Sequence, residues 1–492
     1  MTSFFSWEGL AALMLGGLYG SLFGAIPGLT ATLAVALFIP VAFFLDPVIA
    51  LPAIIAISSV AIFAGDVGSA VAKIPGTPAS AAYLEELYNL SRRKTPLYSL
   101  GISAMGSAVG GMIGTIILII SALGIAAVAR NFSSFEYFWV AILGLSAGIF
   151  ASGGAPLKAF ISLMLGLLLS TVGVDPTLGF PRFHFGNATL LGGLNYIVAM
   201  IGLFGFSEVL ENIYQNQKGS DTQTLTTESS SQQFYTQPLL LILKEKWLVL
   251  RSALLGILVG FLPGAGADIG AWVATSVQKI KQGGNTEKLE EHEDEVILAG
   301  TSSNNAAVAS AWIPALALGL PGDTVTAIVL GVFLMKGITP GPLLFDQQPE
   351  LLWALYLTFF ISNLFLLPFY GYLTARLAAK LINIKLPLLL IVITTLCIVG
   401  AYAINNNLFD VWIMMGMGLL AFILKRGGFP LPQVVLGMVL GPIMEQNFMV
   451  SMIKSRWDWA SFFERPIAIA LMLITLAILF FGMYYRKKMK QS

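Results

Sequence analysis

Long apolar runs separated by short polar stretches dominate the pattern along the chain. In the first part, runs of the length that crosses a bilayer, about 20 residues, lie at about 9–27, 29–45, 48–64, 98–128, 136–150, 157–173 and 192–213. A second set lies at about 247–263, 265–278, 296–335, 352–382, 386–402, 409–424, 428–443 and 466–485. Such runs predict membrane helices. The expected fold is an all-α polytopic integral membrane protein with roughly 11 to 15 membrane segments.

One polar stretch divides the chain into two parts. Residues 215–237 are rich in Ser, Thr and Gln and nearly free of aliphatic side chains. A segment of that composition cannot bury a core, so it reads as a flexible linker. We therefore expect an N-terminal membrane repeat at 1–214, a polar flexible linker at 215–245, a C-terminal membrane repeat at 246–445, and a terminal membrane helix with a basic tail at 446–492.

Composition agrees with a membrane protein and excludes several other classes. The 492 residues are 57% hydrophobic and only 11% charged, whereas soluble domains carry about 25% charged residues. The net charge of +1 argues against a nucleic-acid partner. The single cysteine, Cys397, excludes an internal disulfide and a cysteine-based metal site. The N-terminus has no Lys or Arg before its first apolar run, so we expect that run to be retained as a membrane helix rather than removed as a signal peptide.

Clusters of Lys and Arg orient the chain, because they are enriched in cytoplasmic loops. Placing the N-terminus outside and the C-terminus inside puts the clearest clusters on the inner side: 92–94, 244–251, 376–385, 425–426 and 486–488. The scheme requires 66–83 and 313–335 each to enter and leave on one side, or to count as broken pairs. Lys454 and Arg456 are its exceptions.

The two parts share an internal repeat built on Pro-Gly breaks. GSLFGAIPG at 20–28 corresponds to GILVGFLPG at 256–264, and KIPGTPASAA at 73–82 corresponds to GLPGDTVTAI at 319–328. Each half thus holds two breaks in the same order, on opposite sides of the polar linker. With an odd number of crossings per half, the halves form two inverted-topology repeats with discontinuous or re-entrant helices. That arrangement is typical of secondary transporters, with the binding site at the breaks.

A broken helix exposes free N–H groups at its positive end, which suit an anion, and free carbonyls, which suit a small cation. The predicted substrate-binding residues lie at and just after the breaks, together with two amides: Pro27, Gly28, Leu29, Thr30, Thr32, Pro75, Gly76, Thr77, Ser80, Pro263, Gly264, Ala265, Gly266, Asn304, Asn305, Pro321, Gly322 and Thr324.

Simpler roles exist for parts of this set. The glycines at 16, 20 and 24 are better explained by close helix packing. The hydroxyl groups can bond to carbonyls of their own helices. Asn304 and Asn305 can instead cap the following helix.

Carboxyl groups inside apolar segments are costly, so each is a functional candidate. We predict that Asp66, Asp268 and Asp323 bind a coupling ion, Na⁺ or H⁺. An ion pair between Asp66 and Lys73 is the alternative for the first of them.

The chain resembles the large membrane subunit of tripartite tricarboxylate transporters. The resemblance is carried by PGLTATLAVALFIP (27–40), IPGTPASAA (74–82), GFPRFHFGNATLLGGLNYIVAMIGLFGFSEVL (179–210), FLPGAGADIGAWVA (261–274), SNNAAVASAWIPALALGLPG (303–322), VGAYAINNNLFDVWIM (399–414) and FPLPQVVLGMVLGPIMEQN (429–447). It implies a multi-pass protein of the bacterial cytoplasmic (inner) membrane, with a periplasmic N-terminus, that takes up carboxylates by alternating access driven by a Na⁺ or H⁺ gradient. It also implies two partners, a small membrane subunit and a periplasmic substrate-binding protein, and no cofactor.

Several positions depart from the family pattern. Gly300 and Thr301 stand in place of a Pro-Glu pair, the run 63–66 ends in Asp66 rather than Ser, and Asp323 also replaces a Ser. A Thr of the family corresponds to Tyr83. Because one carboxylate is lost and two are gained, we expect a divergent member whose substrate or coupling ion differs from that of citrate-type members.

Three other functions compete with transport. GLSAG at 144–148 matches G-x-S-x-G, but the chain offers only His184 and His292, both in predicted loops, as a base. We therefore expect no enzyme. A channel is distinguished from a carrier by flux that neither saturates nor collapses with the ion gradient. A non-transporting scaffold would tolerate Gly28→Leu and Gly264→Leu.

Overall fold

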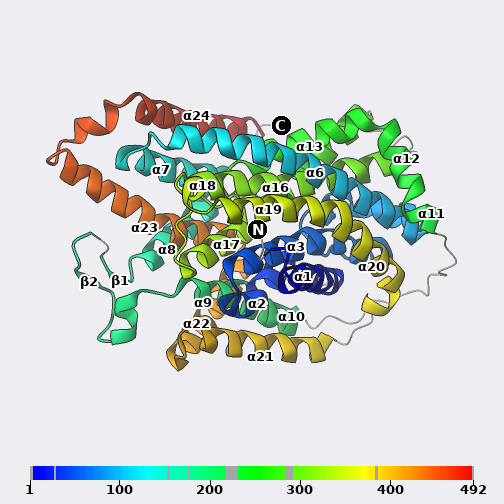
Figure 1. Ribbon diagram of the computed structural model, residues 1–492, viewed down its shortest axis with the longest axis horizontal. Helices are drawn as coiled ribbons and strands as arrows, with labels where there is room; N and C mark the ends of the chain where they lie inside the picture. The colour runs from blue at the N-terminus through cyan, green and yellow to red at the C-terminus, as the bar shows by residue number, and fades with distance from the viewer. Residues whose placement is uncertain are drawn as a thin grey trace.

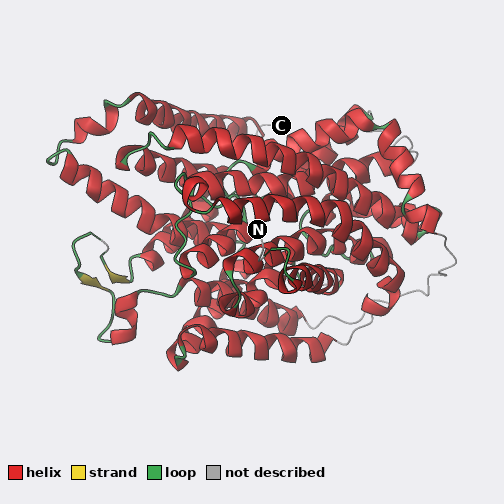
Figure 2. Ribbon diagram, in the orientation of Figure 1, coloured by secondary structure: helices red, strands yellow, loops and turns green. Residues whose placement is uncertain are grey.

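The computed structural model describes residues 4–26, 29–151, 156–175, 177–215, 231–264, 266–282, 292–382 and 386–489. These residues are almost all helical, apart from a small antiparallel hairpin of β1 (Gly173–Val174) and β2 (Pro181–Arg182) (Figure 2). Seven of the described helices are long and apolar enough to cross a membrane. The all-α polytopic membrane fold is therefore confirmed, while the number of membrane segments and the inverted topology stay predictions.

The N-terminal half follows the predicted runs closely. Its helices are α1 (Trp7–Ala25), α2 (Ala31–Phe44), α3 (Pro47–Ala64), α4 (Asp66–Ala72), η1 (Ser80–Tyr83), α5 (Leu84–Arg93), α6 (Pro96–Ala129), α7 (Ser134–Ala151), α8 (Pro156–Ser170), η2 (Ala188–Gly192), α9 (Tyr196–Met200), η3 (Ile201–Phe206) and α10 (Ser207–Gln215). Hydroxyl caps fix several starts: Thr30 accepts from the N–H of Leu33 before α2, as expected of an N-cap threonine.

The C-terminal half contains helices that the sequence did not predict. Its elements are α11 (Ser231–Phe234), α12 (Thr236–Lys244), α13 (Lys246–Gly260), α14 (Ala267–Lys281), α16 (Glu293–Leu318), α17 (Thr324–Met335), α18 (Leu344–Gln347), α19 (Pro349–Ile361), η4 (Ser362–Leu366), α20 (Leu367–Ile382), α21 (Leu386–Asn405), α22 (Leu408–Arg426), α23 (Leu431–Lys454), η5 (Trp459–Phe463) and α24 (Pro466–Met489). The central α16 lies between α6 and α19 in the view of Figure 1.

The linker expected at 215–245 needs a correction in the part that the structure describes. Residues 231–234 and 236–244 form α11 and α12, and both helices pack on α6. The reason is local, because Phe234 is fully buried and Ile242 is nearly so, and buried apolar side chains stabilise an ordered segment. The polar residues 216–230 lie outside the described residues.

The first helix of each broken pair packs tightly against the long helix that follows the pair. A Cβ on Gly20 of α1 would lie 2.4 Å from the carbonyl oxygen of Ile57 on α3, and one on Gly24 would lie 2.2 Å from that of Ala61. The packing role expected for these glycines is confirmed. In the second half, Gly260 of α13 approaches the carbonyl oxygen of Ala307 on α16 in the same way, at 2.3 Å.

The hairpins α1–α2 and α13–α14 point in opposite directions. Helix α2 runs parallel to α17, since Thr32 contacts Thr324 at their starts and Lys336 donates to the carbonyl oxygens of Phe43 and Leu45 at their far ends. The residues that follow α17 lie beside the end of α16, and α16 runs parallel to α13. The tips of the two hairpins therefore face each other.

Candidate functional site

Segments from all four Pro-Gly breaks surround one small cavity of about 110 Å³, a volume that holds several water molecules. The residues that line it are Thr30, Ala31, Thr32, Ile62, Thr77, Pro78, Gly264, Gly266, Ala267, Asp268, Asp323, Thr324, Val325 and Pro432. Eight of them belong to the predicted set: Thr30, Thr32, Thr77, Gly264, Gly266, Asp268, Asp323 and Thr324. The cavity thus joins segments that lie far apart in the sequence.

Direct hydrogen bonds connect the breaks at this cavity. The hydroxyl oxygens of Thr32 and Thr324 lie 2.8 Å apart and join the first break to the fourth. The N–H of Gly266 donates to the carbonyl oxygen of Gly322 at 3.3 Å and joins the third break to the fourth. Gly266 has a φ of 78°, a backbone conformation that favours glycine. The breaks therefore form one hydrogen-bonded cluster.

Asp323 combines a cavity-lining position with a structural role. It is the N-cap of α17, and its Oδ1 accepts from both the N–H and the hydroxyl of Thr326, each at 2.7 Å. The N–H of Asp323 donates to the Thr326 hydroxyl oxygen at 2.8 Å, which completes a capping box. The positive end of α17 also favours this carboxylate. One oxygen of Asp323 is thus committed to the helix start.

Asp268 ties the second break to the third. It lies in the first turn of α14, and its Oδ1 accepts from the N–H of Ala79 at 3.1 Å. A second hydrogen bond between α14 and this segment runs from Nε1 of Trp272 to the carbonyl oxygen of Pro78, at 3.0 Å. Helix α14 therefore holds the segment after the second break in place.

Asp66 does not line the cavity, and the alternative prediction, an ion pair between Asp66 and Lys73, is wrong. Lys73 pairs with Glu85 at 2.7 Å instead of with Asp66. The backbone explains this, because Lys73 ends α4 in a left-handed conformation with a φ of 58°, and it is exposed. Asp66 is buried and accepts hydrogen bonds from Tyr83 and Ser103.

Asn304 and Asn305 are not helix caps, because α16 begins at Glu293 and both amides lie in its interior. They are buried away from the cavity lining, and their Oδ1 atoms have no hydrogen-bond partner within the described residues. Ser80 is also buried and bonds to Thr77 instead of lining the cavity.

The remaining predicted residues support or flank the breaks. The structure places Leu29, Pro75, Gly76, Pro263, Pro321 and Gly322 beside the cavity segments but not in the lining. The predictions at Pro27, Gly28 and Ala265 lie outside the described residues.

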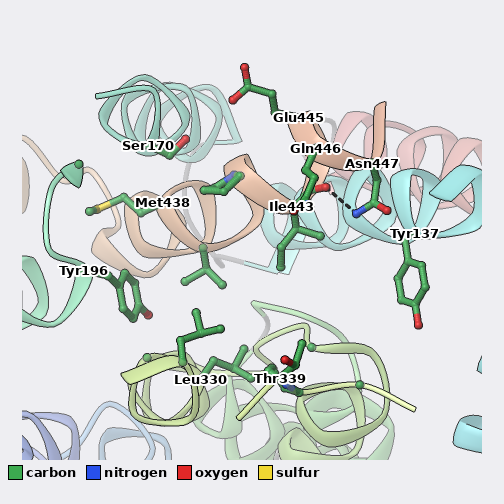
Figure 3. Close-up of a pocket in the computed structure, with 18 of the residues that line it drawn as sticks. Tyr137, Ser170, Tyr196, Leu330, Thr339, Met438, Ile443, Glu445, Gln446 and Asn447 are labelled. Atoms are coloured by element: carbon green, nitrogen blue, oxygen red, sulfur yellow. Dashed lines mark hydrogen bonds between the residues drawn. The ribbon is translucent and has the colours of Figure 1, made fainter. Parts of the chain in front are cut away.

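A second, larger cavity of about 770 Å³ was not predicted. Figure 3 shows it between α23, which carries Met438 and Ile443, and α17, which carries Leu330. Polar groups lie on both sides of it in this view: Ser170 and Tyr196 on the left, and on the right Asn447, whose Nδ2 donates to the carbonyl oxygen of Ile443 at 2.8 Å. No single sequence pattern marks this cavity, because it is assembled mostly from apolar side chains of separate helices.

The charged groups of the larger cavity pair with one another. Arg182, on the β1–β2 hairpin, binds both carboxylate oxygens of Glu445 on α23, and it lies 3.6 Å from Asp175. Asp175 accepts from the N–H groups of Leu178 and Thr177, and these bonds, together with Arg182, hold its pKa below its usual value. The bonds to Glu445 raise the pKa of Arg182. These contacts attach the hairpin to α23.

The two cavities lie along the same pair of helices. Val325 and Pro432 line the small cavity, while Leu330 and Met438 line the larger one further along α17 and α23. At 1.5 Å per residue, the separation is roughly 8 to 9 Å. A buried apolar cluster that includes Leu320, Leu436 and Leu440 occupies the same region.

Comparison with known proteins gives consistent matches over most of the chain. The family model described as the tripartite tricarboxylate transporter TctA family matches residues 10–436. An Agrobacterium vitis protein, described as an uncharacterized 52.8 kDa protein in the TAR-I ttuC' 3' region, is 33% identical over 481 residues, which are 94% of this chain and 91% of that protein. Another from the same organism, in the TAR-II ttuC' 3' region, is 36% identical over 221 residues, 44% of this chain and 89% of that protein. No solved structure matches the chain.

Proposed function

The chain belongs to the tripartite tricarboxylate transporter TctA family, and we propose that it is the permease subunit that moves a carboxylate through the small cavity. Membership implies a transporter subunit that works with a small membrane subunit and a periplasmic binding protein. The proposed location is the bacterial inner membrane, and the proposed driving force is a gradient of Na⁺ or H⁺.

The observation that carries this proposal is the convergence of four helix breaks on one cavity. The capped starts of α2 and α17 line it with their positive ends, and Thr30, Thr32 and Thr324 add hydroxyl groups. Helix starts and hydroxyls suit a substrate carboxylate. The breaks come from both halves of the chain, as expected when a site lies between two repeats.

The charges around the cavity favour cotransport with a cation. Asp268 and Asp323 line it, whereas no Lys, Arg or His does so among the described residues. A carboxylate substrate would add negative charge beside two carboxyl groups, and that is costly away from water unless cations or protons enter with it. Carboxylate and hydroxyl oxygens are also the ligand type that hard cations prefer.

The arrangement of the two hairpins and the two cavities supports alternating access. The hairpins reach the cavity from opposite directions, as inverted repeats would. The larger cavity lies toward the end of α8 that leads to the β1–β2 hairpin, whereas Lys158 at the other end contacts the carbonyl oxygen of Gly427 beside Lys425 and Arg426. Because basic residues favour the cytoplasm, the larger cavity is proposed to face outward as an entry vestibule.

Uptake by reconstituted vesicles tests this function. The chain, its small membrane subunit and the binding protein would be assayed with mono-, di- and tricarboxylates under separate Na⁺ and H⁺ gradients. We expect saturable uptake that collapses when the gradient is removed. Flux that does not saturate would favour a channel.

The scaffold alternative has its own test. Gly264 has a φ of 74°, and a Cβ there would lie 3.0 Å from the Cα of Gly148. Gly264→Leu should therefore distort the third break and abolish uptake. Normal uptake by this variant would favour a non-transporting scaffold.

A further inference from the structure

A buried polar cluster lies behind the small cavity. Asp66 and Tyr83 are each 1% exposed, and Ser103 is fully buried. The hydroxyl of Tyr83 donates to Asp66 Oδ1 at 2.9 Å, and that of Ser103 donates to Oδ2. None of these three residues lines either cavity. The cluster therefore holds a carboxyl group out of water and out of reach of a substrate in the cavity.

The partners of Asp66 are hydroxyl groups rather than cations. Among the described residues, no Lys, Arg or His forms an ion pair with it, and basic residues of adjoining elements pair elsewhere: Lys73 with Glu85, and Lys279 with Glu86. A buried carboxylate without a cation is costly. A bound proton removes that cost, and a hydroxyl oxygen can then accept the new O–H bond.

Gly300 on α16 makes room for this cluster. A Cβ at position 300 would lie 2.4 Å from Cδ1 of Tyr83 and 2.9 Å from Cγ2 of Thr275. Any side chain there would displace the Tyr83 ring. The contact of Tyr83 with Asp66 thus depends on a specific fit between α16 and the segment after the second break.

One short segment links Asp66 to the small cavity. Tyr83 is the last residue of η1, and Ala79 just before η1 donates its N–H to Asp268. In the same segment, Ser80 and Thr77 exchange hydrogen bonds, and Thr77 lines the cavity. Residues 77–83 thus form a continuous hydrogen-bonded connection between Asp66 and the cavity.

We propose that Asp66 is the proton-binding site that couples transport by this chain to a proton gradient. It acts through Tyr83 and the 77–83 segment on Asp268, and it does not touch the substrate. The inference rests on the function proposed above and narrows its coupling ion to H⁺. Sodium coupling is the rival, since the free Oδ1 atoms of Asn304 and Asn305 are neutral ligands for a cation.

The test compares Asp66→Asn with Asp410→Asn in vesicles that contain the complete transporter. Asp410 is a matched control, being 2% exposed and hydrogen-bonded to Asn405 on the distant pair α21–α22. With one proton per substrate, a gradient of one pH unit supports about tenfold accumulation. We expect Asp66→Asn to lose this accumulation while substrate exchange without net proton movement stays within about threefold of wild type. Asp410→Asn should keep both activities.

A pH-sensitive dye inside the vesicles gives the direct readout. Substrate entry should move protons in the wild type and in Asp410→Asn but not in Asp66→Asn. Proton movement and accumulation like wild type in Asp66→Asn would overturn the inference. Accumulation of carboxylate by the wild type on a Na⁺ gradient alone would overturn it too, while leaving the proposed function intact. Absence of carboxylate transport under every gradient would instead contradict the proposed function.

If Asp66→Asn also loses substrate exchange, Tyr83→Phe provides a second test. This variant keeps the carboxyl group but removes one donor to it. Because a charged carboxylate loses more from this than a neutral one, the pH midpoint of uptake should rise by at least about half a unit. An unchanged midpoint would overturn the inference.

Discussion

The small and the large cavity differ in where their polar groups come from. The small one, about 110 Å³, is lined by hydroxyl and carboxyl groups from the segments after four helix breaks. The large one, about 770 Å³, is lined mainly by apolar residues of several helices and of the segments between them, such as 191–194 and 339–343. We therefore place the candidate site by the convergence of polar groups rather than by volume. Convergence of such groups at interrupted backbone is the pattern expected of a transporter binding site.

The cavities differ equally in charge balance. At the large one, Arg182 pairs with Glu445 and also lies 3.6 Å from Asp175. At the small one, the described partners of Asp268 and Asp323 are N–H and hydroxyl donors. We therefore expect a mobile cation or proton to accompany the carboxyl groups of the small cavity, whereas Arg182 and its partners hold the hairpin in position.

The largest expected effect is the difference in uptake between removing a carboxyl charge from the small cavity and removing one from the larger cavity. Asp268→Asn removes a charged acceptor for the N–H of Ala79 and one of the two carboxyl groups that line the small cavity. We expect initial uptake rates to fall by on the order of 100-fold or more. Glu445→Gln in the larger cavity should lower them by less than about threefold, because it loosens the hairpin without touching the site. If the two variants were present in the membrane at equal amounts and lost the same share of the uptake rate, the two cavities would not differ in their importance for transport.

A matched pair of hydroxyl deletions sharpens the comparison. Thr324→Val keeps the shape of the side chain but removes the bond to Thr32 and a donor at the small cavity. The KM for the carboxylate should rise about tenfold, in line with about 1.4 kcal/mol for one lost hydrogen bond. Thr339→Val in the larger cavity should change KM by less than about twofold. The measurement is uptake over a range of substrate concentrations, and a larger rise for Thr339→Val would contradict the assignment.

The apolar cluster near both cavities predicts a smaller effect. Leu436 is 3% exposed and packs in the cluster with Leu320 and Leu440. Leu436→Ala leaves a gap there, so substrate efflux from loaded vesicles without a gradient should increase a few-fold. Leu334→Ala is the control, since Leu334 lines the larger cavity and is 60% exposed. An unchanged leak for Leu436→Ala would show that the cluster is not the barrier.

The smallest expected effect is the response of the β1–β2 hairpin to a change of pH. The pKa of Asp175 is lowered by N–H donors and by Arg182, so its contribution to stability is present above the pKa of the unfolded chain, about 3.9. It is lost only as pH falls through the lower folded value. A spin label at the exposed position Phe185 should therefore report no change in mobility between pH 7 and pH 5. Loosening within that range would show that another group holds the hairpin.

Much of the fold could be predicted because helix-length apolar runs have few alternatives in a membrane. The runs at 98–128 and 409–424 match α6 and α22 to within a few residues. The exceptions have local causes. The run at 296–335 is two helices, α16 and α17, because Gly319 adopts a φ of 71° and Asp323 caps a new start. Helices α11 and α12 were missed because their aliphatic run, 239–243, is short and follows a long polar stretch.

The candidate site could be predicted where a residue adjoined a repeated Pro-Gly break, and hardly elsewhere. Thr32 and Thr324 were found because the breaks recur, although their contact spans 292 residues. Asn304 was predicted at the substrate site, with a helix cap as the alternative, because it stands at the start of an apolar run, but it lies inside α16 and outside the cavity lining. Lys73 looked like the partner of Asp66 from sequence proximity alone, whereas a left-handed residue directs its chain away. The larger cavity carried no signal, since no repeated residue type marks it.

The glycine contacts of α1 with α3 and of α13 with α16 have a mechanical consequence. Backbone against backbone leaves no side chain whose rotamer can yield at these positions, so we expect α1 to move together with α3, and α13 with α16. We then expect the small cavity to open by a sliding of these two blocks past each other. The bonds to break in such a slide are those that cross between the blocks, such as Thr32 to Thr324.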